Sequence, residues 1–184
     1  MPVIISMLRG VNVGAHNRIK MDALRALYTS LKLEDPQTYV QSGNVIFRAK
    51  EKPTPQLARK IQAAIEKTFK IKPEIILRTA DDFRAALAIN PFAQRKDVEP
   101  GKLLITFLAD APSPEAQSKL DAFKSLPEEL HLIGRELYIY FPNGAGKSKL
   151  PWAQVEKFLK VPGTARNLNS VMKMLEIADG MEAR

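Results

Sequence analysis

The segment Thr38-Tyr-Val-Gln-Ser-Gly-Asn-Val-Ile-Phe47 decides the fold of this chain, because it has the pattern of a tight β-hairpin. Tyr39 and the run Val45-Ile-Phe47 favour a pleated surface, and Ser42-Gly43-Asn44 has the composition of a turn. Strands joined by so short a turn are antiparallel, since parallel neighbours need a crossover of about a dozen residues. A second short hairpin is predicted around Gly134-Arg135. The two hairpins favour antiparallel sheets over a doubly wound parallel sheet.

The segments that flank the first hairpin complete a single unit. Upstream, the apolar run Val3–Leu8 predicts a buried strand, and residues 21–31 repeat apolar side chains at helical spacing. Downstream, Thr54-Pro55 is an N-cap followed by proline at the first helical position. The helix that it opens is followed by a short strand at residues 74–78. The order β-α-β-β-α-β over residues 1–80 predicts a ferredoxin-like subdomain.

The rest of the chain repeats this order of elements. Residues 81–101 are predicted to form a short helix and a polar linker. Residues 102–184 are predicted to form a second subdomain, in which a final helix stands where the fourth strand is expected. We therefore predict an α+β fold with two ferredoxin-like (βαββαβ) subdomains and antiparallel sheets. In this prediction the second subdomain ends in a helix instead of its last strand.

The composition excludes several kinds of function. The 184 residues include no cysteine, so disulfides, thiolate nucleophiles and thiolate metal sites are ruled out. The first apolar run ends before Arg9 and is too short for a signal peptide or a membrane span. His16 and His131 are the only histidines, and they lack the spacing of metal ligands. We expect a cytoplasmic protein with no metal, no cofactor and no membrane partner, and no pattern names a catalytic residue.

Positive charge is concentrated in the first half of the chain. Residues 1–80 hold 14 Lys and Arg against 6 Asp and Glu, whereas residues 81–184 hold 14 of each. The net charge of +8 therefore comes from the first half alone. An anionic partner explains a one-sided excess better than solubility does, and solvated lysines are the simpler alternative.

These cations are expected to gather at one edge of the first sheet. In the expected topology the first and third strands run parallel, side by side, so the loops that follow them emerge together. The basic edge would then comprise Arg9, Arg18, Lys20, Arg48, Lys50 and Lys52, with the Ser42–Asn44 turn at the opposite end. Clustered like charges destabilise a fold, and screening over roughly 8–10 Å removes only part of that cost. Such a cluster therefore suggests a bound anion.

The loop between the first strand and the first helix contributes two further candidates, Asn12 and Asn17. Its glycines do not match the dinucleotide-binding fingerprint. The asparagines either hydrogen-bond to the backbone of their own loop or help backbone N–H groups and Arg9 to hold a phosphate or carboxylate.

Two loops of the second half are also candidates. Gly144-Ala-Gly-Lys-Ser148 follows a predicted strand and precedes a helix, but Phe141 stands where the P-loop pattern needs its first glycine. This loop is either a turn or a set of donors to an anion, namely Lys147, Ser148 and Lys149. In the segment 164–170, Asn167 or Asn169 is expected to cap the last helix. Arg166 and the other asparagine are not needed for the cap, and so they are candidates for a binding site.

Aromatic residues on the predicted strands give weaker support for nucleic-acid binding. Such residues stack bases in RNA-recognition domains, although the RNP1 pattern is absent here and strand aromatics more often pack in a core. The residues concerned are Tyr39, Phe47, Tyr138, Tyr140 and Phe141.

Five motifs of this sequence resemble those of the bacterial domain of unknown function 1697 family. They are Leu8-Arg-Gly-Val-Asn-Val-Gly14, Tyr39-Val-Gln-Ser-Gly-Asn-Val-Ile-Phe47, Asn90-Pro-Phe92, Ser148-Lys-Leu150 and Thr164-Ala-Arg-Asn-Leu-Asn-Ser170. The chain departs from the family pattern at Ala15, where glycine is frequent, and at Leu168, where tryptophan is frequent. The resemblance implies an α+β fold with two ferredoxin-like subdomains. It implies no substrate and no catalytic residue.

Three hypotheses for function follow from the sequence. The first is a protein that binds a phosphate-bearing or other anionic ligand, either a small molecule or nucleic acid, through the basic loops of the first half. The second is a small enzyme acting on an anionic metabolite, with polar loops of both halves forming the pocket and Arg9, Lys20, Lys147 and Arg166 holding the substrate. The third is that the polar loops only join the two halves.

Overall fold

The computed structural model describes residues 1–123 and 127–184 of the chain. The chain divides into two compact units, Met1–Arg84 with Lys173–Arg184, and Ala85–Met172. The sequence analysis placed the boundaries at residues 80 and 101 and assigned the whole C-terminal segment to the second subdomain, whereas Lys173–Arg184 belong to the first unit. The predicted boundaries stay a prediction for where independently folding domains begin and end.

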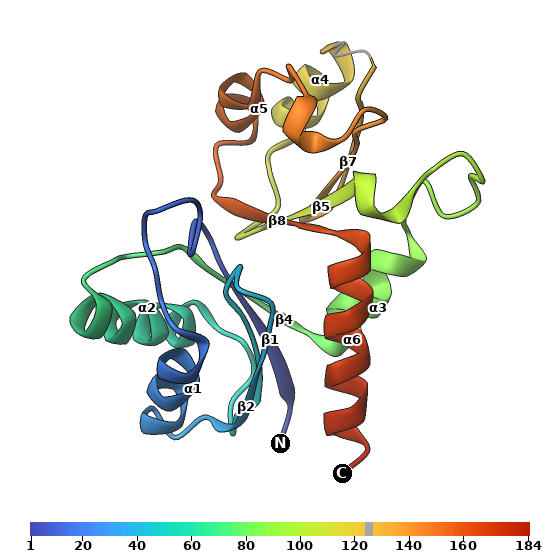
Figure 1. Ribbon diagram of the computed structural model, residues 1–184. Helices are drawn as coiled ribbons and strands as arrows, with labels where there is room; N and C mark the ends of the chain where they lie inside the picture. Colours follow the sequence, from blue (N-terminus) through green and yellow to red (C-terminus); the bar gives the residue numbers. More distant parts are fainter. Residues whose placement is uncertain (124–126) are drawn as a thin grey trace. The chain divides into compact units, whose positions relative to one another are not determined.

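The first unit contains a four-stranded antiparallel sheet, and the helices α1 and α2 connect its strands along the chain (Figure 1). The strands lie in the order β2-β3-β1-β4, and β1 pairs with both β3 and β4. The elements in chain order are β1 (Val3–Leu8), α1 (Met21–Ser30), β2 (Glu34–Tyr39), β3 (Asn44–Arg48), α2 (Pro55–Phe69), β4 (Ile75–Thr79) and α3 (Ala80–Ala88). This order and connectivity are those of a ferredoxin-like unit.

One face of this sheet packs against α1 and α2. Ile4, Leu8 and Phe47 are buried there with apolar side chains of both helices, and Tyr28 of α1 meets the ring of Phe47 at 5.3 Å. The hydroxyl of Ser6, on the same face, is hydrogen-bonded to that of Tyr28 at 2.8 Å. Removal of this apolar surface from water is the main stabilising contribution of the unit.

The C-terminal part of α6 (Leu168–Glu182) lies beside the other face (Figure 1). Met174, Ala178 and Met181 of this helix are buried. The guanidinium of Arg84 forms ion pairs with Asp179 and with Glu182, the latter at 2.8 Å. The last turns of the chain are therefore an integral part of the first unit.

The second unit repeats the same sheet, in the order β6-β7-β5-β8. Its elements are η1 (Pro100–Lys102), β5 (Leu103–Leu108), α4 (Pro114–Ala122), β6 (Glu129–Ile133), β7 (Glu136–Tyr140), η2 (Ala145–Lys147), α5 (Trp152–Leu159) and β8 (Gly163–Asn167). The registers match between units, since Arg78 of β4 lies opposite Ile5 and Arg166 of β8 lies opposite Ile105.

The predicted fold class is confirmed, with one correction. Both units are α+β, each with an antiparallel ferredoxin-like sheet, and the chain ends in a helix as predicted. The second sheet nevertheless has its fourth strand, because β8 pairs with β5 over five residues and α6 follows it rather than replacing it. No helix among the described residues is long and apolar enough to cross a membrane.

Candidate anion-binding site

The expected basic edge does not form, because β1 and β3 are antiparallel. Arg48 lies opposite Val3 at the beginning of β1, whereas Arg9 follows Leu8 at its end. These ends are five residue steps apart, roughly 17 Å along the strand. The prediction that Arg48, Lys50 and Lys52 gather with Arg9, Arg18 and Lys20 was therefore wrong.

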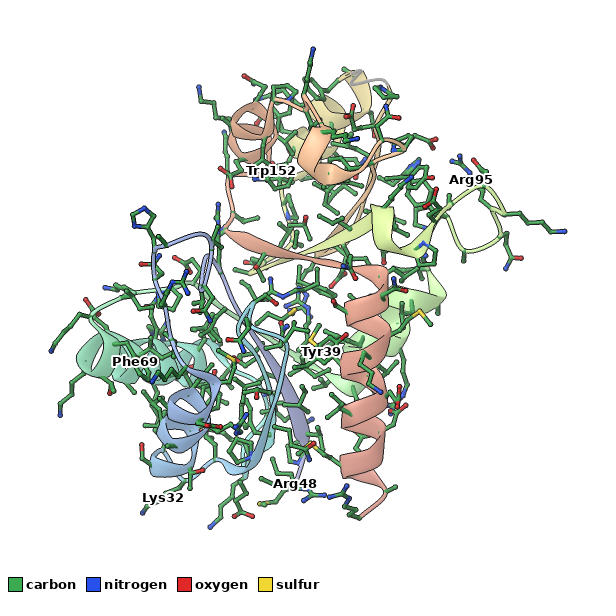
Figure 2. The ribbon with its side chains drawn as sticks, in the orientation of Figure 1. Lys32, Tyr39, Arg48, Phe69, Arg95 and Trp152 are labelled. Atoms are coloured by element: carbon green, nitrogen blue, oxygen red, sulfur yellow. The ribbon has the colours of Figure 1, made fainter. Side chains whose placement is uncertain are left out.

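Arg48 has a structural role at its own end of the sheet. Its guanidinium donates to the carbonyl of Met181 in α6 and lies 3.4 Å from a carboxylate oxygen of Asp35 (Figure 2). Lys50 is exposed and lies two residues after Arg48, just beyond the end of β3. Neither residue belongs to a site with Arg9.

Asn12 organises the loop between β1 and α1. Its side-chain amide donates to the carbonyls of Ile19 at 3.0 Å and Gln41 at 2.7 Å, and its oxygen accepts from the N–H of Ile19 at 2.8 Å. Both amide hydrogens are therefore used within the protein. The bond to Gln41 ties this loop to the β2–β3 turn, which the sequence prediction had placed at the opposite end of the sheet.

The tip of the same loop is held by its own hydrogen bonds. Asn17 donates from its side chain to the carbonyl of Gly10 at 3.2 Å, and its carbonyl accepts from the N–H of Asn12 at 2.9 Å. Arg18 donates to the carbonyl of Gly14 at 3.2 Å, and Lys20 is the exposed N-cap residue of α1. Asn12 and Asn17 both have left-handed backbone angles, which asparagine tolerates better than most residues. The asparagines thus hold the shape of the loop.

A pocket of about 470 Å³ opens beside this loop. One wall comes from the start of the loop and the other from the connection between α2 and β4. The backbone N–H of Arg9 donates to the carbonyl of Glu74 at 3.0 Å and joins the two walls. The lining residues are Arg9, Gly10, Val11, Asn17, Lys70, Ile71, Lys72, Pro73 and Glu74. Three cations and one carboxylate therefore share one small concave surface.

Two of these cations, Lys70 and Lys72, were missed in the sequence analysis. Lys70 is the C-cap of α2 with φ of 62°, and its ammonium group donates to the carbonyl of Lys67 at 2.9 Å. Lys72 lies 3.7 Å from a carboxylate oxygen of Glu66, and both of these side chains are largely exposed. The sequence does carry a signal for these residues, because a ferredoxin-like order places the start of the fourth strand beside the end of the first.

The connection that carries the two lysines is fixed by the fold. The side chain of Gln62 in α2 donates to the carbonyl of Pro73 at 2.8 Å. Val11 and Pro73 are buried and supply an apolar part of the lining. The backbone of this wall is therefore set independently of any ligand.

The Gly144–Ser148 segment of the second unit contains the short 3₁₀ helix η2 (Ala145–Lys147). Ser148 donates to a carboxylate oxygen of Glu128 at 2.6 Å and accepts from the N–H of Leu150 at 3.0 Å. The short 3₁₀ helix η2 precedes it, and Lys147 and Lys149 are exposed. A carboxylate already occupies the position where a phosphate oxygen would accept from the serine, so this loop is not arranged as a P-loop.

The candidate residues of segment 164–170 mainly form hydrogen bonds that stabilise the second unit. Arg166 is buried and donates to the hydroxyl of Thr164 at 2.8 Å and to the carbonyl of Ala165 at 2.9 Å. Burial lowers the pKa of Arg166 to about 10, so it stays charged at neutral pH. Asn167 accepts from the N–H of Ser170 at 2.9 Å as the N-cap of α6, whereas Asn169 is exposed.

The strand aromatics do not form an exposed platform for bases. Phe47, Tyr138, Tyr140 and Phe141 are all buried. The hydroxyls of Tyr138 and Tyr140 donate to the carbonyls of Ala86 and Asp97 at 2.6 and 3.1 Å. Only Tyr39, which is half-buried, keeps part of its ring accessible. Among the described residues there is also no group of His, Cys, Asp and Glu that could hold a metal ion.

The comparisons with known proteins agree with this architecture. The model of the family described as protein of unknown function (DUF1697) matches residues 1–138. The chain belongs to this family. A conserved bacterial protein from Streptococcus pneumoniae has a similar solved structure, with a TM-score of 0.70 and 21% sequence identity over 96% of this chain and 98% of that one. At this identity the likeness concerns the fold alone. No curated protein matches the chain.

Proposed function

We propose that this protein binds a small phosphate-bearing ligand in the pocket between the β1–α1 loop and the α2–β4 connection of the first unit. The observation that carries the proposal is the presence of Arg9, Lys70 and Lys72 on the lining of one cavity of about 470 Å³. Pockets for small molecules and cofactors have volumes of roughly 300–1,000 Å³. Neither a solvated helix face nor a flat surface would place three basic residues on the lining of one pocket.

The chemistry of the lining suits a phosphate better than a neutral ligand. A guanidinium offers paired N–H donors that match two oxygens of a phosphate, and lysine ammonium groups add compact positive charge. Charge-assisted hydrogen bonds of this kind are roughly twice as strong as neutral ones.

The internal repeat supports a ligand in the first unit only. The backbone bond from Arg9 to Glu74 has its counterpart in the second unit in the bond from Ala109 to Pro162, at 2.8 Å. Ala109 and Pro162 are uncharged, whereas Lys160 of the second unit corresponds to Lys70, so the second unit lacks the counterpart of Arg9 but keeps that of Lys70. Arg9, Lys70 and Lys72, which line the pocket, are thus among the residues that give the first half its excess positive charge.

Two lysines at equivalent positions give a matched test. Lys70 and Lys160 are both C-cap residues in the left-handed conformation, and each N–H bonds back to a glutamate carbonyl of its own helix, α2 or α5. Lys70→Gly and Lys160→Gly each remove one positive charge and relieve the same backbone strain. Both variants are expected to be as stable as the original protein or more stable.

The measurement is the affinity for inorganic phosphate, followed by ³¹P NMR or by amide shifts at low ionic strength. Lys70→Gly should weaken it by about three- to tenfold, the effect of one partly solvated charge-assisted contact of about 0.7–1.4 kcal/mol. Lys160→Gly should leave it unchanged. An equal loss in both variants, or no binding by the original protein, would contradict the proposal.

Nucleic acid is the main alternative ligand and makes a different prediction. A protein that contacts about four phosphates of duplex DNA loses affinity with salt at a log–log slope near −3.6. A small ligand in one pocket replaces few counterions and gives a much shallower dependence. A steep slope would therefore assign the cations to a nucleic-acid surface. The enzymatic alternative has no observation that favours it, since Arg166 is buried and Ser148 is bonded to Glu128.

A further inference from the structure

We infer that the ligand of this pocket is a phosphorylated polyhydroxy compound of the sugar phosphate class, an inference that rests on the proposed function. The observation behind it is the fourth charged residue of the lining, Glu74, which is the one acidic residue among those that line the pocket. The three cations account for a phosphate, and Glu74 has to be explained separately.

The carboxylate of Glu74 is exposed and forms no ion pair with any residue that the structure describes. Lys72 forms its ion pair with Glu66 rather than with Glu74. For a ligand that consists of phosphate alone, a carboxylate in the same pocket only adds repulsion. For a ligand that also carries hydroxyl groups, it is a strong acceptor, because an ionised carboxylate accepts hydrogen bonds at both oxygens.

The rest of the lining separates a sugar from a nucleobase. It includes no aromatic side chain, whereas sites that bind bases commonly stack them on aromatic rings. Val11 and Pro73 are buried, and the half-buried Ile71 instead offers an aliphatic surface on which the C–H groups of a sugar ring can pack. The combination of cations, one acceptor carboxylate and aliphatic contacts therefore matches a phosphate ester of a polyol.

The test compares four probes, namely glucose 6-phosphate, inorganic phosphate, glucose and AMP, by calorimetry or amide-shift titration on the full chain. Glucose 6-phosphate is expected to bind at least about tenfold more tightly than inorganic phosphate. AMP should show no such gain, and glucose alone should bind far more weakly than glucose 6-phosphate.

Glu74→Gln tests the role of the carboxylate directly. It should leave the affinity for inorganic phosphate unchanged or raise it, while the preference for glucose 6-phosphate falls toward a ratio of one. Glu51→Gln, which removes a carboxylate near the opposite end of the first sheet, is the control and should change neither affinity. Because the side chain of Glu74 is exposed and only its backbone carbonyl is bonded to Arg9, the variant is expected to keep its melting temperature.

The outcomes distinguish this inference from the function on which it rests. If inorganic phosphate and glucose 6-phosphate both fail to bind, the proposed function is wrong. If phosphate binds but the sugar ester gains nothing, if AMP binds best, or if Glu74→Gln keeps the preference, the sugar phosphate inference is wrong and phosphate binding stands.

Discussion

Single residues hold the loops near the C-terminal end of β1 in shape, and some do so under strain. Val40 has φ of 51° in the β2–β3 turn, a left-handed conformation that is a genuine outlier for a β-branched side chain. Its side chain is 48% exposed, so little packing compensates for the strain. The next residues, Gln41 and Gly43, accept hydrogen bonds from Asn12 and from the N–H of Leu8.

Val40→Asn is therefore expected to stabilise the protein. Asparagine tolerates the left-handed region, and relief of the strain should raise the free energy of unfolding by about 1 kcal/mol. For a chain of this size the melting temperature should rise by roughly 2–4 °C. Val13→Asn is the control, because Val13 is also exposed but has no positive φ. A lower melting temperature for Val40→Asn, measured by circular dichroism, would show that the strain argument is mistaken.

Asn12 is expected to be the residue of the β1–α1 loop on which stability depends most. Asn12→Ala removes three hydrogen bonds, leaves the carbonyls of Ile19 and Gln41 without this donor, and puts alanine at φ of 55°. We expect a loss of about 2–3 kcal/mol in urea denaturation. Asn169→Ala, at an exposed position, should lose far less. Equal losses would mean that the hydrogen bonds of Asn12 contribute nothing.

At the scale of elements, the hairpins and helix caps were predicted well from the sequence. The hairpin at residues 38–47 is confirmed, although its first strand begins at Glu34. The N-cap predicted at Thr54 is also confirmed, since its hydroxyl accepts a hydrogen bond from the N–H of Leu57 at 3.1 Å. These features depend on neighbours within a few residues, and so they can be read from a single sequence.

The features that failed depend on pairing between distant segments. Strand β8 was missed because Gly163-Thr-Ala-Arg-Asn167 is short and polar, and its two most buried inward residues, Thr164 and Arg166, are not apolar. The basic edge was misplaced because the direction of β3 relative to β1 was assigned wrongly. Lys70 and Lys72 were missed because they lie beside Arg9 only when β4 is the antiparallel neighbour of β1, and the sequence analysis did not pair these two strands.

The last helix should contribute to stability through its buried methionines. Met174 of α6 is fully buried, whereas Met172, two residues earlier, is 53% exposed. Met174→Ala is expected to lower the free energy of unfolding by about 2–4 kcal/mol, the usual range for a buried large-to-small change. Met172→Ala should change it by less than about 0.5 kcal/mol. Similar urea midpoints for the two variants would contradict the assignment of residues 173–184 to the core of the first unit.

At the scale of the whole molecule, two similar sheets differ in their chemistry. Their registers match, since Ile5 lies opposite Arg78 and Ile105 lies opposite Arg166. The pocket lined by Arg9, Lys70 and Lys72 lies in the first unit. A repeated scaffold with one charged copy is an economical explanation for the uneven charge of the chain, in which residues 1–80 carry the whole excess. The central claim is therefore about place: an anion binds at the end of β1 and not elsewhere.

The most direct test is a ¹H–¹⁵N NMR titration of the 20.6 kDa protein with inorganic phosphate. The account predicts the largest amide shifts at Gly10, Val11, Asn17, Lys70, Ile71, Lys72 and Glu74, with little change at residues 48–52, 109–110 and 147–149. Shifts centred on Arg48 to Lys52 or on Lys147 to Lys149, or no saturable shift anywhere, would contradict it.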